Sequence, residues 1–429
     1  MTPPDDHPLR YSLANELHAR PFPVAQAPGW AAYLALKPES DAAARDRGAE
    51  RAHLLALLDR FGAPHPQPDA THWYGALGRH WLKWESHTEF VTYTLLGSGG
   101  DRQPFDPALF ELFPSDWLAA APGTRLTSAL FRIEVAQDDG EIGAKADGWF
   151  VPESLAISRM LDDQIVAAAD FRIDPAGHMR FAVWARPETG ERRVGRVVQR
   201  LCEIETYKAI AMLGFARARD LGLRMGELDA RLTALVADMA GSGRAEESLH
   251  ALLDISAALE AMIARSSFRF GATEAYEALV HQRIEALRED RFEGRQSLRE
   301  FMARRFDPAM RTAASTRARL QAMAERAKRA GDLLRTRVDV ERSAQNQRLL
   351  ESMDRRADLQ LRLQHTVEGL SVVAISYYAV GLALYLLGPL THQIDKAWLA
   401  AGVTPLVVLA TWLGLRRIKR GIADGAPHD

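Results

Sequence analysis

The sequence has only one cysteine, Cys202, among its 429 residues. A single cysteine excludes a disulfide framework and a zinc or iron–sulfur site built from the cysteines of one chain. No GxGxxG, GxxxxGK[ST] or GxSxG string occurs, so the common nucleotide cradles and the hydrolase nucleophile elbow are missing. Cys202 is next to Glu203 and close to Glu205, and acidic neighbours raise a thiol pKa. We therefore expect no enzyme activity.

The chain also lacks an excess of charge of either sign. Its 54 Lys and Arg residues are balanced by 56 Asp and Glu residues, which leaves a net charge of −2. This balance offers no overall attraction for nucleic acid, and we expect no nucleic-acid partner. The first twenty residues, MTPPDDHPLRYSLANELHAR, contain no apolar run of the length that a signal peptide needs, so we expect a cytoplasmic start.

Charge is missing altogether from two stretches near the C-terminus, residues 369–390 and 397–415. As helices they would be about 33 Å and 28 Å long, enough to cross a bilayer. Basic residues lie before the first stretch and after the second, at Arg355, Arg356, Arg362, Arg416, Arg417, Lys419 and Arg420. Positive charge marks the cytoplasmic side. The pattern predicts a two-helix membrane hairpin, with both termini and a basic tail (416–429) in the cytoplasm.

Small and hydroxylated residues recur at helical spacing along the first apolar stretch. They are Ser371, Ala374, Tyr378, Gly381, Tyr385 and Gly388. Such a stripe packs against a helix or lines a wet cavity, so it either contacts the second span or lines the pore of an oligomer. The connector between the spans holds one acid, Asp395, which would lie at the outer mouth of such a pore.

Proline is rare between residues 192 and 368, where Pro308 stands alone and apolar residues follow a helical period. We expect a helical subdomain at 191–307 and a stalk helix at 308–368, with breaks near 241–243 and 306–308. The stalk carries an apolar seam at Leu320, Met323, Ala327, Ala330 and Leu334. This seam either joins copies of the chain into a homo-oligomer or lies on its own domain.

Residues 1–190 alternate between short apolar segments and turns, which is typical of an α+β domain with a largely antiparallel sheet. Expected strands are 31–36, 81–96, 126–136, 164–173 and 179–185, and expected helices are 41–61 and 107–112. The segment FRIDPAGHMRFAVW predicts a hairpin. The predicted fold is thus an α+β domain, a long helical stalk region and a C-terminal transmembrane hairpin.

One predicted strand carries a row of polar side chains. In HWLKWESHTEFVTY, strand alternation puts Glu85, His87 and Glu89 on one face with Trp81 and Lys83. Carboxylate and imidazole groups bind divalent cations, and His18 can complete such a site. The alternative is a polar strand face in contact with solvent. No other cofactor is identifiable.

Three strings, NELHARPFP, LKWESHTEFVTYT and VEGLSVVAISYYAVGL, resemble a bacterial family of predicted membrane-anchored proteins of unknown function. The resemblance covers essentially the whole chain, and its first motif contains Asn15, Glu16, His18 and Arg20, for which turn and ion-pair roles are the alternative to ligand binding. The overall plan is also similar to that of CorA-type magnesium channels. Those channels have Gly-Met-Asn after the first span, where this chain has Leu387-Gly388-Pro389-Leu390.

Two functions follow from these patterns. The chain is either a membrane-anchored protein whose cytoplasmic domain binds a ligand or partner, or a CorA-like oligomeric channel or transporter. A membrane-bound metal hydrolase using Glu85, His87 and Glu89 is a third hypothesis.

Overall fold

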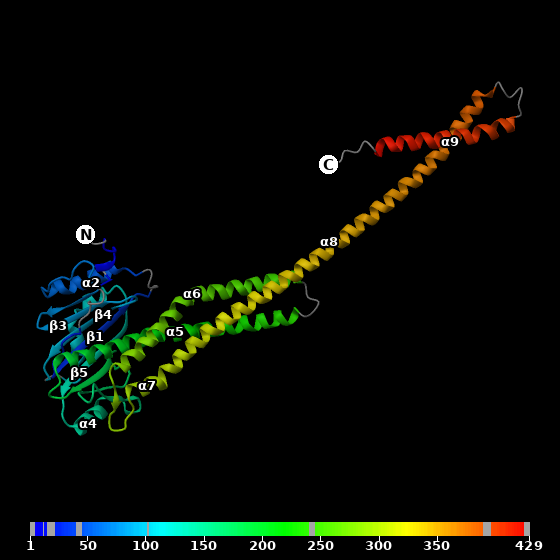
Figure 1. Cartoon of the computed structure of the whole chain (residues 1–429). Helices are drawn as coiled ribbons and strands as arrows, with labels where there is room; N and C mark the ends of the chain where they lie inside the picture. The colour runs from blue at the N-terminus through cyan, green and yellow to red at the C-terminus, as the bar shows by residue number, and fades with distance from the viewer. Residues whose placement is uncertain are drawn as a thin grey trace. The chain divides into compact units, whose positions relative to one another are not determined.

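The computed structural model describes residues 5–11, 13–14, 22–39, 45–100, 103–239, 245–388 and 396–423, without the side chains of residue 396 and residues 418–423. The chain divides into two compact units, Met1–Gly331 and Asp332–Asp429. The first unit contains the sheet, the helices around it and the beginning of the longest helix (Figure 1). The second unit contains the rest of that helix and the last helix.

In the described part of the chain, nine strands form one sheet in the order β2-β3-β4-β1-β5-β8-β7-β6-β9. The strands are β1 (Gly29–Lys37), β2 (His72–Leu77), β3 (His80–Ser86), β4 (Val91–Ser98), β5 (Thr124–Val135), β6 (Ala156–Met160), β7 (Ile165–Ala169), β8 (Met179–Ala185) and β9 (Asp290–Arg291). Neighbouring strands pair antiparallel except β5 and β8, which are parallel. The predicted α+β domain with a largely antiparallel sheet is confirmed, and so is the β7–β8 hairpin.

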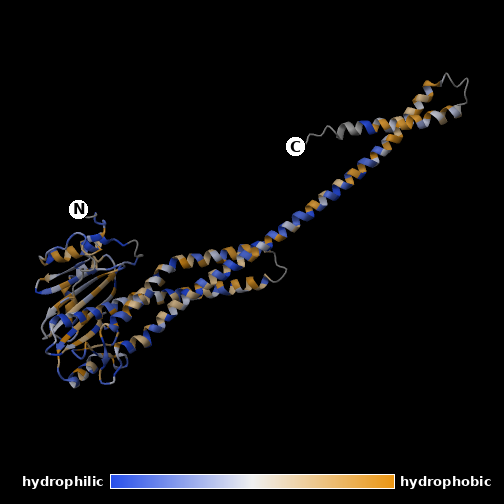
Figure 2. Cartoon of the chain, viewed as in Figure 1, coloured by the Kyte–Doolittle hydropathy of each residue, from blue (hydrophilic) through white to orange (hydrophobic). Residues whose placement is uncertain are grey.

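Both faces of the sheet are covered, which explains why β1 has no charged residue between Gly29 and Leu36. Ala31 and Tyr33 point into the core on one face, while Trp30, Ala32 and Leu34 point into the core on the other. A strand buried on both faces is a continuous apolar run rather than an alternating one. Figure 2 shows the resulting concentration of hydrophobic residues along the strands.

Helices of different lengths cover the two faces. Apolar residues of α5 (Glu191–Asp238), α6 (Ala245–Glu285) and α7 (Leu298–Arg305) pack on the first face. Shorter helices cover the second face: α2 (Arg47–Arg60), η2 (Pro107–Leu112), α3 (Ser115–Ala119) and α4 (Asp139–Trp149). A further short helix, η3 (Pro152–Ser154), precedes β6. Of the helix expected at 41–61, residues 47–60 are helical, and residues 41–44 lie outside the described part.

The single strand expected at 81–96 is wrong, because the chain turns back within it. β3 ends at Ser86, which pairs with Val91 of β4, so residues 87–90 form a turn. The buried guanidinium of Arg45 holds this turn, since it donates to the carbonyl oxygens of His87 and Phe90 and pairs with Glu50. The bonding partners come from a segment about forty residues earlier, so nothing in the local sequence marks the turn.

The long helices expected in this region are present. α7 ends at Arg305, and one continuous helix, α8, runs from Asp307 to Leu386. Pro308 follows the first residue of α8, where a missing N–H costs no hydrogen bond. The break expected at 241–243 falls in residues 240–244, which lie outside the described part.

Burial in the single chain supports the alternative that the apolar seam of the stalk lies on its own domain. Four of its residues, Leu320, Met323, Ala327 and Ala330, belong to the first unit and are buried. Within the first unit, Arg319 and Arg326 of α8 both form ion pairs with Asp229 of α5. The structure therefore has α5, α6 and the start of α8 side by side (Figure 1).

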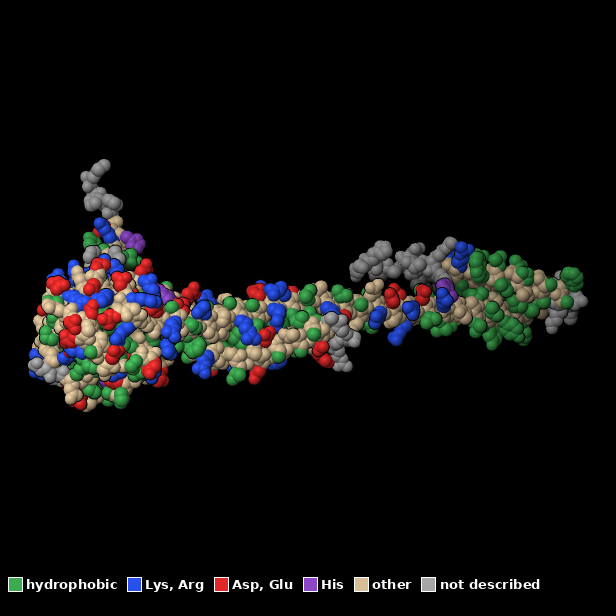
Figure 3. Space-filling model, turned by 90° about the horizontal axis from the view of Figure 1, so that it is seen from below, with side chains coloured by type: hydrophobic (Ala, Val, Ile, Leu, Met, Phe, Trp, Pro, Cys, Tyr) green, Lys and Arg blue, Asp and Glu red, His purple; other side chains and the backbone are tan. Residues whose placement is uncertain are grey.

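Two helices in the described residues are long and apolar enough to cross a membrane, α8 through its C-terminal part and α9 (Lys396–Ala423). Each of the two helices contains an apolar window of 18 residues. Only 6% of the window in α8 is buried, and none of the window in α9. Figure 3 shows hydrophobic side chains gathered over these segments, whereas the preceding part of α8 carries mixed charges. An apolar helix that stays exposed is unlike the core helix of a soluble protein, whose apolar face is buried.

Candidate functional site

The predicted metal residues do not converge. Glu85 is the next-to-last residue of β3, whereas His87 and Glu89 lie in the β3–β4 turn. The Glu89 carboxylate is buried and pairs with Arg269 of α6, and the His87 ring stacks on Phe90 with ring centroids 4.3 Å apart. Among the described residues, no group of three or more His, Cys, Asp or Glu residues is arranged to hold a metal ion. His18 lies outside the described residues.

Glu85 belongs instead to a buried hydrogen-bond network between the sheet and α5. Strand alternation does place Lys83 and Glu85 on the α5 face, as expected from the sequence. Lys83 Nζ lies 2.6 Å from Gln199 Oε1 and 3.1 Å from Glu85 Oε1. The Lys83 side chain is only 2% exposed, so its charge is compensated inside the protein by the Glu85 carboxylate.

The network continues along α5 to α6. Gln199 Nε2 donates to Glu203 Oε1 at 2.9 Å, and Glu203 Oε2 pairs with the Arg283 guanidinium. Burial acts to lower the pKa of Arg283, but the Glu203 charge and hydrogen bond outweigh it and raise the pKa. Four charged residues therefore neutralise one another in two pairs, Lys83 with Glu85 and Arg283 with Glu203.

Arg200, which also lies on α5, has no carboxylate partner among the described residues, unlike Lys83 and Arg283. Its guanidinium donates to the carbonyl oxygen of Ala286 at 2.6 Å, just beyond the end of α6. Its pKa is lowered by burial and by the charges of Arg196 and Arg283, which exceed the opposing effect of Glu203. Among the described residues, Arg200 thus brings positive charge that its neighbours leave uncompensated.

These groups line a polar cavity of about 250 Å³. Its walls include Glu85, Glu203, Arg200 and Arg283, and Phe22 lies under the guanidinium of Arg200 at 5.9 Å. The cavity residues come from β3, the β3–β4 turn, α5, the end of α6 and the N-terminal segment. They are Phe22, Glu85, His87, Gln199, Arg200, Glu203, Tyr207, Arg283 and Ala286.

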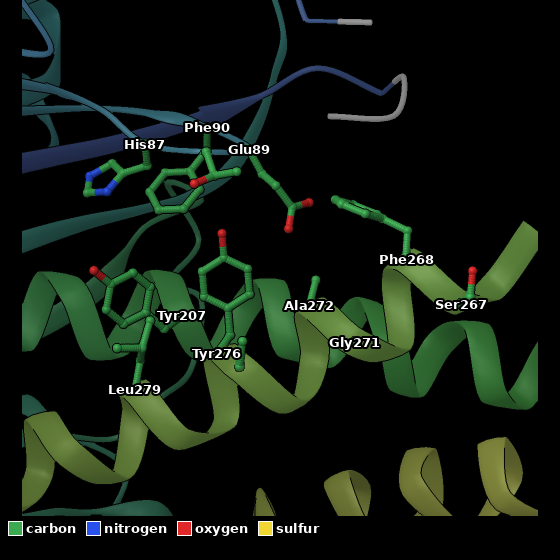
Figure 4. Close-up of a pocket in the computed structure, with 12 residues that line it drawn as sticks. His87, Glu89, Phe90, Tyr207, Ser267, Phe268, Gly271, Ala272, Tyr276 and Leu279 are labelled. Carbon is green, nitrogen blue, oxygen red and sulfur yellow. The ribbon is translucent and has the colours of Figure 1, made fainter. Parts of the chain in front are cut away.

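A larger, mainly apolar cavity of about 760 Å³ lies between the β3–β4 turn and α6. Figure 4 shows Phe90 above the rings of Tyr207 and Tyr276, with Glu89 reaching toward Phe268 from the turn. The floor on α6 is made of small residues, Gly271, Ala272 and Ala275. Burial and the nearby Glu89 charge raise the pKa of Tyr276, so its hydroxyl is neutral and able to donate a hydrogen bond. His87 and Tyr207 line both cavities.

Cys202 lies close to this region but is unsuited to nucleophilic chemistry. Its side chain is buried, and burial together with the Glu203 charge raises the pKa of the thiol. The direction agrees with the expectation from its acidic neighbours.

The remaining predicted residues are divided between exposed and undescribed positions. Tyr378 and Tyr385 of the stripe are 76% and 87% exposed in the single chain, and Ala374 and Gly381 are exposed too. The shielded face of this helix runs instead through Ser376, the buried residue of the span, with Ser371 and Gly388 of the stripe half-buried. Asp395 and the motif residues Asn15, Glu16, His18 and Arg20 lie outside the described residues.

Sequence reasoning missed most of the residues that line the cavities. Glu85, His87 and Glu89 belong to the predicted strand face, but Gln199, Arg283 and Tyr276 lie on helices far along the chain. Each is an ordinary polar residue on an amphipathic helix, and only the packing of α5 and α6 against the sheet brings them together.

A model of a protein family described as "Protein of unknown function (DUF3422)" matches residues 5–422. The match covers nearly the whole chain and confirms the expectation of an uncharacterised family. No curated protein and no solved structure matches the chain. The resemblance to CorA-type channels therefore stays a prediction.

Proposed function

Since the chain belongs to this family of proteins of unknown function, its own residues are the guide to its role, and we propose that it is a bacterial inner-membrane protein whose cytoplasmic N-terminal unit binds a ligand. In this proposal the C-terminal helices are a membrane anchor, and the unit from Met1 to Gly331 has no catalytic activity.

The observation that carries the proposal is the exposure of the two apolar helices. An apolar stretch of 18 or more residues that stays almost entirely uncovered by protein is stable in lipid and unfavourable in water. Arg355 and Arg356 before the first span and Arg416 and Arg417 after the second support a hairpin with both ends in the cytoplasm.

Ligand binding without catalysis is supported by the pairing of charges around the cavities. Glu85, Glu89 and Glu203 each form a salt bridge with a lysine or arginine side chain. None of these carboxylates is therefore available as a general base. The cavities together provide a concave, largely apolar surface with a few convergent polar groups, which is typical of small-molecule sites. No cofactor is part of the proposal.

Membrane fractionation tests the anchor. We expect the wild-type chain in the membrane fraction, resistant to extraction by salt or alkali. Replacing Leu382 and Leu386 by arginine places two charges in the first span. Each charge costs about 3 kcal/mol of insertion free energy, so the protein should be released from the membrane. The matched control replaces Leu361 and Leu363 by arginine; these residues are similarly exposed on α8 but lie outside the span, so the protein should stay membrane-bound. Recovery of the wild type in the soluble fraction would refute the anchor.

The exposed hydroxyls of Tyr378 and Tyr385 favour one second candidate, an oligomeric channel related in plan to CorA. A tyrosine hydroxyl within a bilayer needs a partner, and copies of this helix around an axis would provide one. The mass of the particle in nanodiscs separates the candidates: a ring of four or more chains favours the channel, and a monomer or dimer excludes a central pore.

A further inference from the structure

We propose that the two cavities form one binding site for a single-chain anionic amphiphile, a molecule with one carboxylate or phosphate head and one alkyl tail. This inference rests on the proposed ligand-binding role of the N-terminal unit and specifies the chemistry of the ligand. The head lies in the polar cavity beside Arg200, and the tail lies along α6 in the apolar cavity.

The two cavities adjoin each other, since His87 and Tyr207 line both. The polar one measures about 250 Å³ and the apolar one about 760 Å³. A ligand that extends from one to the other is therefore polar at one end and apolar over most of its length. This asymmetry distinguishes an amphiphile from a compact polar metabolite, which would fill only the smaller cavity.

The apolar cavity exists because α6 carries small residues where it faces the β3–β4 turn. A Cβ atom built on Gly271 would meet no other atom within 4 Å, so open space lies above this position. Phe90 and Tyr276, whose ring centroids are 6.3 Å apart, together provide an apolar wall, and Leu279 lines the end near Tyr207 (Figure 4). An alkyl chain would remove this surface from water, which is the main driving force for such binding.

The charge of the head follows from the balance of the polar cavity. Glu85 is neutralised by Lys83 and Glu203 by Arg283, so Arg200 supplies the surplus positive charge. Arg196 lies beside it, and both guanidinium groups stack on Phe22 at 5.9 Å and 5.2 Å. A guanidinium binds a carboxylate or phosphate through two parallel hydrogen bonds, whereas a cationic head would be repelled.

The test uses the full chain in nanodiscs of zwitterionic phosphatidylcholine. The probe is decanoate with a photoreactive diazirine on its tail, and mass spectrometry locates the labelled peptide. Decanoate, decyl phosphate and decyltrimethylammonium serve as competitors with the same tail and different heads. We expect labelling of α6 around Gly271. We also expect the two anions to compete at concentrations at least about tenfold lower than the cation, since only the anions accept charge-assisted hydrogen bonds from the guanidinium of Arg200.

Two substitutions test the placement of tail and head. Gly271→Leu fills the apolar cavity and should abolish the label, while Gly222→Leu, on α5 where a Cβ also meets no atom within 4 Å, should retain it. Arg200→Gln should weaken competition by the anions about tenfold or more, whereas Arg224→Gln, exposed on the same helix, should not. Thermal unfolding of each variant shows whether a lost label reflects a lost fold, and the competition with wild-type protein needs no variant.

Each outcome bears on a separate statement. Equal competition by the cation would overturn the anionic head and leave ligand binding in place. A label that survives Gly271→Leu would overturn the position of the tail. Blocking by phosphatidylglycerol in the nanodisc would assign the site to a two-chain bilayer lipid and overturn the single-chain ligand. Absence of any label on α6 would overturn both this inference and the proposed binding role.

Discussion

At the scale of single residues, the decisive feature is which charged side chains are paired. Glu85 and Glu89 were expected on one strand face, but the turn after Ser86 separates them. Glu85 pairs with Lys83, and Glu89 pairs with Arg269, 180 residues later in the chain. Alternation along a strand was a sound guide up to the turn and failed beyond it, because the position of the turn depends on distant Arg45.

Replacing Glu89 by Gln should lower the free energy of unfolding by about 3 kcal/mol, because it leaves the Arg269 guanidinium, 15% exposed, without its buried counter-charge. Chemical denaturation of the full chain measures the change. Asp220→Asn, which removes an exposed ion pair with Arg217, is the matched control and should have no measurable effect. Equal changes in the free energy of unfolding would show that the buried Glu89–Arg269 pair contributes no more to stability than an exposed pair.

The stability of the first unit should fall as the pH drops below about 6.5, the ordinary pKa of histidine. Burial lowers the pKa of His53, whose Nε2 donates to the Trp117 carbonyl oxygen at 2.9 Å and whose Nδ1 accepts from Tyr93 at 3.0 Å. Between the lowered folded pKa and the unfolded pKa, the unfolded chain binds more protons, so stability rises with pH in that window.

His53→Gln keeps the donor to Trp117 and should reduce this pH dependence. Some dependence should remain, because burial also lowers the pKa of His178. Urea unfolding at several pH values between 5 and 8 gives the slope. An unchanged slope in the variant would rule out His53 as a contributor.

At the scale of elements, the helices were more predictable than the strands. The apolar period along 191–238 and 307–386 repeats over many turns, so local errors average out. Strands β2, β6 and β9, and helix α4, were not expected, because a segment of a few residues provides too little pattern. Nothing in the sequence indicated either that α5 and α6 pack closely against each other, which the small residues Gly214 and Thr273 allow.

Gly214 of α5 lies in close contact with Thr273 of α6. A Cβ atom added there would lie 2.0 Å from Thr273 Oγ1 and 2.8 Å from Thr273 Cβ. Gly214→Ala should therefore destabilise the unit by about 1–3 kcal/mol through overpacking. Gly222→Ala, on the same helix in open space, should stabilise it by up to about 1 kcal/mol through helix propensity. Thermal unfolding distinguishes the two, and stabilisation by both would argue against the close crossing.

At the scale of the whole molecule, the chain separates a packed unit from a helical, largely exposed one. The two core clusters, which fill the two faces of the sheet, lie entirely within residues 25–310. The second unit, from Asp332, has exposed apolar residues such as Leu349, Leu359 and Leu370 but no comparable core among its described residues. Folding and membrane association are therefore expected to be separable properties.

A fragment ending at Val338, just after the buried Leu334, should fold alone. We expect it to be soluble and to unfold within a few degrees of the full chain, since it retains both core clusters. Membrane fractionation and thermal unfolding of fragment and full chain check this. An aggregated fragment, or one recovered with membranes, would show that the C-terminal helices belong to the folding unit.

The sequence by itself determined the class of the first domain, the long helices and the two apolar spans, because each depends on a repeating local pattern of hydrophobicity. Only the tertiary structure decided where the chain turns after β3 and which acids are paired. It also buried the first four residues of the α8 seam, Leu320 to Ala330, within the first unit, and opened a cavity above Gly271. These features depend on contacts between residues far apart in the chain, and such contacts leave no periodic trace in the order of the amino acids.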